Sequence, residues 1–281
     1  MTLSTAQRDL LDTWIPGHRL VADMSWGIVD STVLRVTRGG TDYVVKAVGP
    51  GNHHLSRELR AHEEVAGHLG DRVARLVAAS EEHHIMVLEY LPGELAERTG
   101  AERDPAIMVQ AGQFLSVLHG IGRTTDETIE ANMTDAALRW LDKPHRIDPN
   151  QARRAREILQ GYAAPTVTVS ACHGDFSGRN WVIDDGYLRV IDFGRFGYRP
   201  PATDLLRLHY RTWIGEPSLR DAFIEGYGPR HDWDQAQWAV SFLREAVSTA
   251  AWAHKIGDRA FESEGLSLVE KALASFDSAV S

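Results

Sequence analysis

The sequence has one cysteine, Cys172, among its 281 residues. A single thiol forms no internal disulfide and is too little for a structural zinc site. No apolar run approaches the roughly 20 residues that span a bilayer, and Met1–Ser4 does not begin a secretory pattern. We therefore expect a cytoplasmic protein that has no membrane partner and resides in a reducing compartment.

Long runs of lysine or arginine are also missing. The chain has 39 acidic and 30 basic residues, which gives a formal net charge of −9. A nucleic-acid partner would have to be held by a local basic patch against this field. We therefore expect no nucleic-acid partner.

What the chain does contain is enough apolar sequence for a substantial core, because 43% of its residues are hydrophobic. The pattern changes along the chain, from short β-like runs to mainly helical spacing. We predict an α+β protein of two lobes. Residues 1–91 form a small, β-rich lobe with one main helix, and residues 92–281 form a larger, mostly helical lobe.

The elements of the small lobe are a hairpin, a helix and a strand. Runs 33–36 and 43–46 are rich in β-branched and aromatic residues, and Gly39-Gly40 between them indicates a turn. Apolar residues at helical spacing predict a helix over about 55–69. The apolar run 85–90 predicts a strand that ends at Pro92-Gly93.

In the larger lobe, residues 107–119 carry apolar side chains at helical spacing, with Gly120 as the expected C-cap. Residues 166–171 and 182–191 read as strands. Long helices are expected near Asp204 and across 233–255.

The segment between those two strand regions has a polar pattern that suits metal-assisted chemistry. Asp175 and Asn180 are five apart, and Asp192 follows a predicted hairpin whose turn is Asp185-Gly186. A two-residue turn there pairs 184 with 187, 182 with 189 and 180 with 191, so Asn180 and Asp192 lie side by side. Two oxygen donors with open positions between them suit Mg²⁺.

The segment His173-Gly174-Asp175, with Asn180 and the triplet Asp192-Phe193-Gly194, resembles the catalytic loop and metal-binding triplet of kinases, specifically the aminoglycoside phosphotransferase (APH) family. The resemblance implies a protein-kinase-like fold and transfer of the γ-phosphoryl group of ATP, or GTP, to a hydroxyl. It implies that Asp175 orients or deprotonates the acceptor, that Asn180 and Asp192 hold Mg²⁺, and that His173 has a structural role.

The same resemblance assigns nucleotide-binding residues to the small lobe. Lys46, the only lysine before residue 143, ends a strand and would contact the α- and β-phosphates, with Glu58 as its carboxylate partner. Glu63 is a weaker partner candidate. The loop 26–32 has one glycine and no G-x-G-x-x-G, so Ser31 either donates to the phosphates or is an ordinary turn serine.

Residues 88–93 resemble the hinge of the family. The Glu89 carbonyl and the Leu91 N–H are expected to bind the adenine edge. Asp204 matches an Asp that braces the catalytic loop and caps a helix, and it is assigned a structural role. The segment 194–200 is too short for a phosphorylated activation loop.

The acceptor is expected to bind the larger lobe, where residues 92–281 hold 27 acidic and 21 basic residues. Carboxylates and tryptophans together can bind a polyamine. The candidates are Asp232, Asp234, Trp238 and Glu245, in a region that also holds Trp213, Asp221, Glu225 and Trp233. These residues are equally typical of a helical core and a solvated face.

We therefore expect a cationic, hydroxylated antibiotic as acceptor, an aminoglycoside or a basic cyclic peptide such as a tuberactinomycin, and a resistance enzyme that is a monomer or homodimer. The alternatives are a metabolic kinase of an amino alcohol or sugar and a ligand-binding pseudokinase. A hydrolase is disfavoured because the sequence contains no G-x-S-x-G.

Overall fold

The computed structural model describes residues 3–25, 31–228 and 234–278. The chain forms two compact units, each interrupted in sequence. The first consists of Met1–Ile121, Ala171–Tyr198 and Gly215–Pro229, and the second of Gly122–Ser170, Arg199–Ile214 and Arg230–Ser281. Each unit has its own core.

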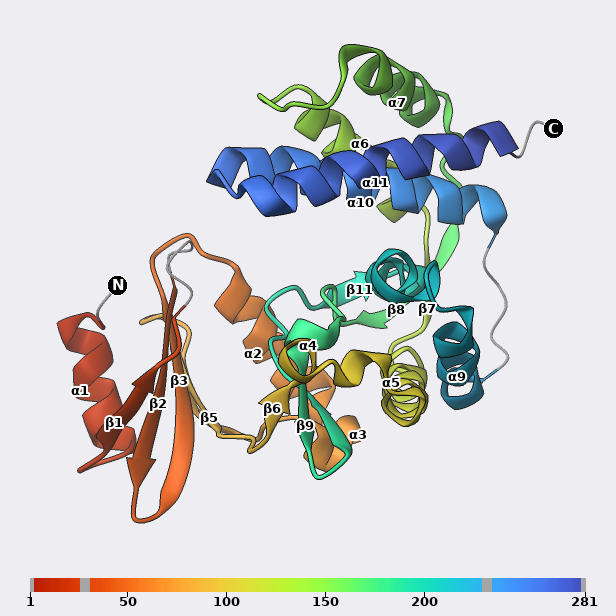
Figure 1. Ribbon diagram of the computed structural model, residues 1–281. Coiled ribbons are helices and arrows are strands. Elements are labelled where there is room, and N and C mark those ends of the chain that lie inside the picture. Colours follow the sequence, from red (N-terminus) through yellow and green to blue (C-terminus); the bar gives the residue numbers. More distant parts are fainter. Residues whose placement is uncertain (1–2, 26–30, 229–233, 279–281) are drawn as a thin grey trace. The chain divides into compact units, whose positions relative to one another are not determined.

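The first unit contains an antiparallel five-stranded sheet in the order β1-β2-β3-β5-β4 (Figure 1). Its strands are β1 (Arg19–Asp23), β2 (Ser31–Arg38), β3 (Thr41–Val48), β4 (Leu76–Ser80) and β5 (Ile85–Glu89). The predicted hairpin is confirmed as β2 and β3, which pair from Ser31 with Val48 to Arg38 with Thr41. Gly39 and Gly40 have φ angles of 59° and 85°, a backbone that glycine adopts without steric cost.

Helix α1 (Thr5–Trp14) precedes the sheet and was not expected from the apolar spacing. Its signal is a capping box, in which the Ser4 side chain accepts from the Gln7 N–H and the Gln7 side chain accepts from the Ser4 N–H. The Gln7 amide also donates to the His83 carbonyl at 2.9 Å. These bonds fix α1 against the sheet.

The predicted helix over 55–69 is present but interrupted. Helix α2 (His54–Glu64) ends at Val65, and a short helix α3 (Ala66–Leu69) follows. Leu55 and Leu59 of α2 pack into a core cluster with Met86 and Leu88 of β5. This buried face sets the orientation of α2 on the sheet.

Helices α5 (Pro105–Leu118) and α9 (Pro217–Tyr227) of the first unit cross closely. A Cβ added at Gly112 would lie 2.1 Å from the Phe223 carbonyl oxygen, and one added at Gly226 would lie 1.9 Å from that of Val109. Glycine is therefore required on both sides of the crossing. The expected cap at Gly120 is wrong by one residue, because α5 is capped by His119.

A three-stranded sheet carries the second predicted hairpin. Its order is β10-β9-β6, with β6 (Glu94–Leu95), β9 (Trp181–Asp184) and β10 (Tyr187–Val190). Asp184 pairs with Tyr187 and Val182 with Arg189, and the Ile191 N–H donates to the Asn180 carbonyl at 2.9 Å. The register predicted from the Asp185-Gly186 turn is thus confirmed.

The second unit is mainly helical. It contains α6 (Ile129–Leu141), α7 (Pro149–Gly161), α10 (Gln235–Ile256) and α11 (Arg259–Ser278), with β7 (Thr124–Asp126) paired to β8 (Val167–Cys172). Helices α10 and α11 lie side by side (Figure 1). Their apolar faces, with those of α6 and α7, form one core cluster.

The expected long helix near Asp204 is wrong. The chain there forms a 3₁₀ turn (Pro201–Asp204), a short helix α8 (Leu206–Leu208) and a π-helical turn (His209–Trp213). The segment is divided among these three short elements, each with its own hydrogen-bond pattern, instead of forming one regular α-helix.

The remaining elements are short. They are α4 (Ala96–Thr99), β11 (Gly197–Arg199) and the 3₁₀ turns Gly70–Arg72, Ala101–Arg103 and Gly178–Asn180. Within the described ranges, no helix is long and apolar enough to cross a membrane.

Candidate active site

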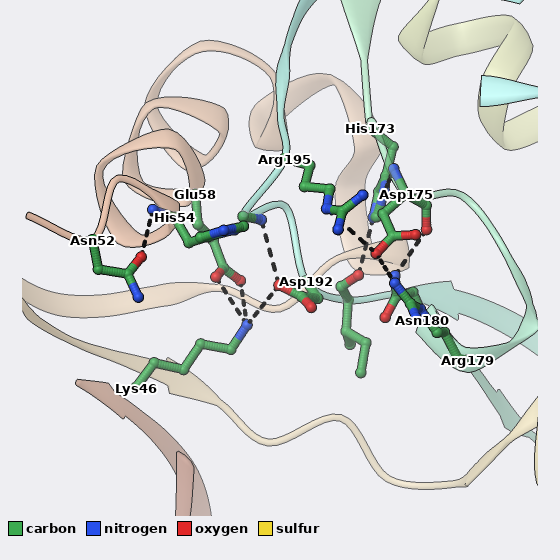
Figure 2. Close-up of polar contacts among 12 residues, drawn as sticks. Lys46, Asn52, His54, Glu58, His173, Asp175, Arg179, Asn180, Asp192 and Arg195 are labelled. Carbon is green, nitrogen blue, oxygen red and sulfur yellow. Dashed lines mark hydrogen bonds and ion pairs between the residues drawn. The ribbon is translucent and has the colours of Figure 1, made fainter. Parts of the chain in front are cut away.

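The first group of the site is an ion pair between a strand and a helix of the first unit. Lys46 Nζ, on β3, lies 2.7 and 2.9 Å from the two carboxylate oxygens of Glu58, on α2 (Figure 2). Burial disfavours the charged ammonium, but attraction by Glu58 and then Asp192 outweighs it and raises the pKa of Lys46. The lysine is therefore held as a cation facing two carboxylates.

Helix α2 is also tied to the segment that follows the Asp192-Phe193-Gly194 triplet. The Tyr198 hydroxyl donates to Glu64 at 2.9 Å, and Arg60 Nε lies 2.9 Å from the same carboxylate. The Arg60 guanidinium lies 5.4 Å from the centre of the Phe196 ring. These contacts fix the helix that carries Glu58.

Asp192 lies beside this pair, with its carboxylate 3.6 Å from Lys46 Nζ. Its side chain is 52% exposed, and the attraction of Lys46, opposed by desolvation, lowers its pKa. Its φ angle is 65°, in the left-handed region that Asp and Asn tolerate better than other non-glycine residues. Asp192 thus presents an ionised, accessible carboxylate.

The loop after β8 holds the other polar groups. The Asp175 N–H donates to His173 Nδ1 at 3.2 Å, and His173 Nε2 donates to the Ile191 carbonyl at 3.0 Å. The His173 ring also packs 4.7 Å from the Phe193 ring. Both imidazole nitrogens are engaged with the backbone, and the structural role expected for His173 stays a prediction.

Asn180 closes the same loop, because its amide nitrogen donates to the Asp175 carbonyl at 2.8 Å. Because the amide nitrogen makes this bond, the amide oxygen of Asn180 points away from the Asp175 carbonyl. The hairpin places Asn180 next to Ile191, one residue before Asp192. An amide oxygen and an accessible carboxylate are hard oxygen donors of the kind Mg²⁺ takes, so the donor set fits that ion.

Two arginines that the sequence analysis missed lie against Asp175. The Arg179 guanidinium contacts Asp175 Oδ2, and Arg195 Nε lies 4.0 Å from the same oxygen (Figure 2). Arg179 directly precedes Asn180 and is four residues from Asp175. That spacing is the available signal for Arg179, whereas the approach of Arg195 depends on how the chain turns after Gly194.

Two histidines of α2 also lie near these groups. Burial, and secondarily the charge of Lys46, lower the pKa of His62 to about 4. Burial, and secondarily the charge of Arg195, lower the pKa of His54. Both rings are therefore neutral near pH 7 and add no positive charge to the site.

Some backbone groups of the hinge residues already form hydrogen bonds within the protein. The Glu89 N–H donates to the Arg75 carbonyl at 2.9 Å, and the Tyr90 N–H donates to the Asp42 carbonyl at 3.1 Å. Neither bond uses the Glu89 carbonyl or the Leu91 N–H, and the adenine-binding role of those two groups stays a prediction.

The phosphate-covering loop is partly outside the described residues, since 26–30 are not included. Ser31 begins β2 and pairs with Val48, and its contact with phosphate stays a prediction. Asp204 is buried at the end of its 3₁₀ turn, but the N-cap of α8 is Leu205. The expected helix-capping and bracing roles of Asp204 both stay predictions.

The residues predicted to bind the acceptor have structural contacts in the second unit. Asp234 caps α10 by accepting from the Gln237 N–H at 2.9 Å, and Glu245 lies 3.0 Å from Arg207. Trp238 packs against the core, 5.2 Å from the His209 ring. Asp232 lies outside the described residues. The acceptor-binding role of all four stays a prediction.

The Lys46–Glu58 pair, the Asp175 loop and the Asp192 triplet, on a β-rich region followed by a mostly helical one, define a phosphotransferase of the protein-kinase-like fold. The chain belongs to the phosphotransferase enzyme family, APH, whose model matches residues 22–239. It is an enzyme that transfers a phosphoryl group to an alcohol. The family resemblance predicted from the sequence is confirmed.

Solved structures of similar fold cover nearly the whole chain. The GDP complex of aminoglycoside 2'-phosphotransferase-IIIa is 16% identical with a TM-score of 0.69, covering 95% of this chain and 97% of that one. The gentamicin complex of APH(2")-IIa is 19% identical with a TM-score of 0.66, covering 96% of each chain. Macrolide 2'-phosphotransferase MphH from Brachybacterium faecium is 17% identical with a TM-score of 0.64, covering 95% of this chain and 98% of that one.

At these identities the likeness establishes the fold. A search of curated protein sequences finds no match.

Proposed function

We propose that the protein transfers the γ-phosphoryl group of ATP or GTP to a hydroxyl of a small antibiotic, with Mg²⁺ held by Asn180 and Asp192. The observation that carries this proposal is the convergence of three groups in one unit: Lys46 on Glu58, Asp192 beside Lys46, and the Asp175–Asn180 loop next to Ile191. Each has the charge and polarity that phosphoryl transfer uses.

In the proposed reaction the acceptor oxygen forms a bond to the γ-phosphorus. The bond from that phosphorus to the β-bridging oxygen breaks, the nucleoside diphosphate leaves, and the hydroxyl proton passes to the Asp175 carboxylate. Lys46 neutralises the α- and β-phosphates while Glu58 holds the lysine in place. When bound, Mg²⁺ supplies charge neutralisation at the phosphate oxygens.

The proposed nucleotide site includes the hinge. The Glu89 carbonyl accepts from the base and the Leu91 N–H donates to it, while Ser31 covers the phosphates. A similar structure with GDP supports a nucleotide ligand, and both ATP and GTP belong in the test.

The acceptor proposed from the sequence is a cationic, hydroxylated antibiotic. Its support is the acidic excess of residues 92–281 and the similarity in fold to a gentamicin-bound enzyme. The similar macrolide enzyme widens the class of hydroxylated antibiotics to be tested.

The test is to incubate the protein with ATP or GTP, Mg²⁺ and single compounds from aminoglycoside, macrolide and basic cyclic peptide classes, with amino alcohols and sugars alongside. Phosphoryl transfer adds about 80 Da to the acceptor, which mass spectrometry detects. The Asp175→Asn variant is the matched control. A gain only on an amino alcohol or sugar rejects the antibiotic assignment, and no gain on any hydroxyl compound rejects the acceptor classes proposed.

A further inference from the structure

Arg35 on β2 and Asp42 on β3 form an ion pair near the turn of their hairpin. Arg35 Nε donates to Asp42 Oδ2 at 2.7 Å, and Arg35 Nη2 contacts the same oxygen. A hydrogen bond from Thr37, and then one from Arg35, lower the pKa of Asp42. The carboxylate is therefore ionised and holds the guanidinium by two of its nitrogens.

The register of the strands explains why these two side chains meet. Thr37 lies opposite Asp42 and Arg35 lies opposite Val44, so Arg35 is diagonal to Asp42. Residues two apart share one face of a strand, and diagonal neighbours are within reach of a long side chain. Asp42 and Lys46 are also an even number of residues apart on β3. The ion pair therefore lies on the sheet face to which the Lys46 side chain belongs.

The same pair reaches the hinge at residues 88–93. Tyr43 of β3 pairs with Glu89 of β5. One residue further along, the Tyr90 N–H donates to the Asp42 carbonyl at 3.1 Å. The Arg35 guanidinium lies 3.9 Å from the centre of the Tyr90 ring. Tyr90 is thus held twice, by its backbone on Asp42 and by its ring on Arg35.

A second arginine at the hinge has a different environment. Arg75 contacts the Glu89 carboxylate, but its side chain is 72% exposed, against 33% for Arg35. An exposed ion pair contributes little because water screens it. A guanidinium that stacks on a ring while its nitrogens donate to a carboxylate uses both its face and its edge. Arg35 is therefore the arginine that can fix the hinge.

We propose that Arg35, Asp42 and Tyr90 are positioning residues for the base of the bound nucleotide. Tyr90 is the residue between the Glu89 carbonyl and the Leu91 N–H, the two groups predicted to bind the adenine edge. A fixed Tyr90 keeps these two groups at a constant spacing before the base arrives. The inference rests on the proposed function, since it needs a nucleotide at the hinge.

The consequence is that loss of the contact weakens binding of the base and spares the phosphates. A hinge without this contact has to be ordered on binding, which lowers the affinity for every ligand that carries the base. Adenosine should therefore lose the same factor as ATP. Because adenosine is uncharged, a change in its affinity cannot come from lost attraction between Arg35 and phosphate.

The test measures binding of adenosine, and of a non-hydrolysable ATP analogue with Mg²⁺, by calorimetry. Arg35→Met and Tyr90→Leu are each expected to weaken both ligands about threefold to tenfold, as for loss of a cation–π contact. Arg75→Met is the matched control, because it removes the same charge from the same hinge, and it should weaken neither ligand. Lys46→Met should weaken the ATP analogue and leave adenosine unchanged.

Further variants separate positioning from a general loss of stability. Tyr90→Phe retains the ring and should bind both ligands as the wild type does. Arg35→Met combined with Tyr90→Leu should bind no more weakly than the weaker single variant, because both substitutions remove one contact. Arg35→Lys, which keeps the charge but not the planar fork, should have an intermediate adenosine affinity. It also serves if Arg35→Met fails to fold.

The outcomes for the hinge and for the proposed function are distinguishable. Unchanged adenosine affinity in Arg35→Met and Tyr90→Leu overturns the positioning role, while binding of the ATP analogue by the wild type still supports the proposed function. An equal loss in Arg75→Met also overturns it, because the loss would then follow the charge and not the contact. A wild type that binds neither ligand overturns both.

Discussion

The two units use the charge of a carboxylate in opposite ways. In the first unit, Asp192 keeps an exposed carboxylate that lies 3.6 Å from Lys46 and accepts from the Gly194 N–H at 3.4 Å. In the second unit, Glu130 is fully buried and accepts from Arg244 at 2.8 Å, Gln237 at 3.0 Å and Tyr162 at 3.2 Å. Burial and then Glu130 raise the pKa of Tyr162 to about 12, which keeps that hydroxyl protonated as a donor.

The difference shows what separates a carboxylate that holds helices together from one that can bind a ligand. Glu130 accepts from three donors and has no exposed surface, so its carboxylate holds α6 and α10 together and is closed to a ligand. Asp192 retains exposed surface for a further cation. Residue type and net charge alone do not distinguish the two cases.

The largest expected effect is on chemistry in the first unit. Asp175→Asn keeps the size of the side chain but cannot accept the hydroxyl proton, so kcat should fall by roughly 10²–10⁴. Asp192→Asn should abolish turnover by removing the charge that holds Mg²⁺. Single-turnover phosphoryl transfer measures both. Near-normal transfer in either variant would remove that residue from the mechanism.

Loss of a charged partner in the second unit should lower the stability of the protein and not its catalytic rate. Arg244→Met leaves the buried Glu130 carboxylate without its cation, and the free energy of unfolding should fall by about 3–5 kcal/mol. Denaturant titration measures this loss. Arg154→Met, which breaks an exposed pair with Asp277, is the control and should cost no more than about 1 kcal/mol. Equal losses for the two variants would contradict the comparison.

A packing change in the first unit tests whether stability there is independent of the charged groups. Gly112→Ala forces a methyl group against the Phe223 carbonyl, and the free energy of unfolding should fall by about 1–3 kcal/mol. Gly67→Ala, where a Cβ meets nothing within 4 Å, is the matched control and should be neutral or stabilising. Thermal unfolding of both variants gives the answer, and a tolerated Gly112→Ala would mean that α5 and α9 can separate.

The smallest effect is a pH dependence at His62. Its pKa is lowered in the folded state to about 4 from 6.5, so the unfolded chain binds more protons between these values. The contribution of neutral His62 to the free energy of unfolding is fully present above pH 6.5 and is lost as the pH falls toward 4. It should amount to about 1 kcal/mol between pH 6.5 and 5.5. Denaturant titrations of wild type, His62→Gln and the exposed control His68→Gln measure it, and only His62→Gln should lose that dependence.

Much of the first unit followed from local signals. The Gly39-Gly40 and Asp185-Gly186 turns determine the registers of their hairpins, because a two-residue loop leaves one pairing. The second of these registers places Asn180 beside Ile191. Local geometry therefore predicted the neighbourhood of Asn180 and Asp192 without any tertiary information.

Other features depend on contacts that local pattern does not contain. One such feature is the break of α2 at Val65. Two others are contacts that the tertiary fold creates, between Arg195 and Asp175 and between Glu245 and Arg207. The acidic excess of residues 92–281 predicted an electrostatic character. It did not predict which carboxylates would already be paired.

The backbone at Asp192 has a consequence for the range of sequences this position accepts. With a φ angle of 65°, it admits glycine, asparagine and aspartate far more readily than other residues. Of these three, only aspartate carries a negative charge. Glutamate, which preserves the charge, would strain the backbone, and asparagine, which preserves the backbone, would lose the charge. No other residue therefore preserves both the backbone conformation and the negative charge, so every single substitution at Asp192 loses one of them.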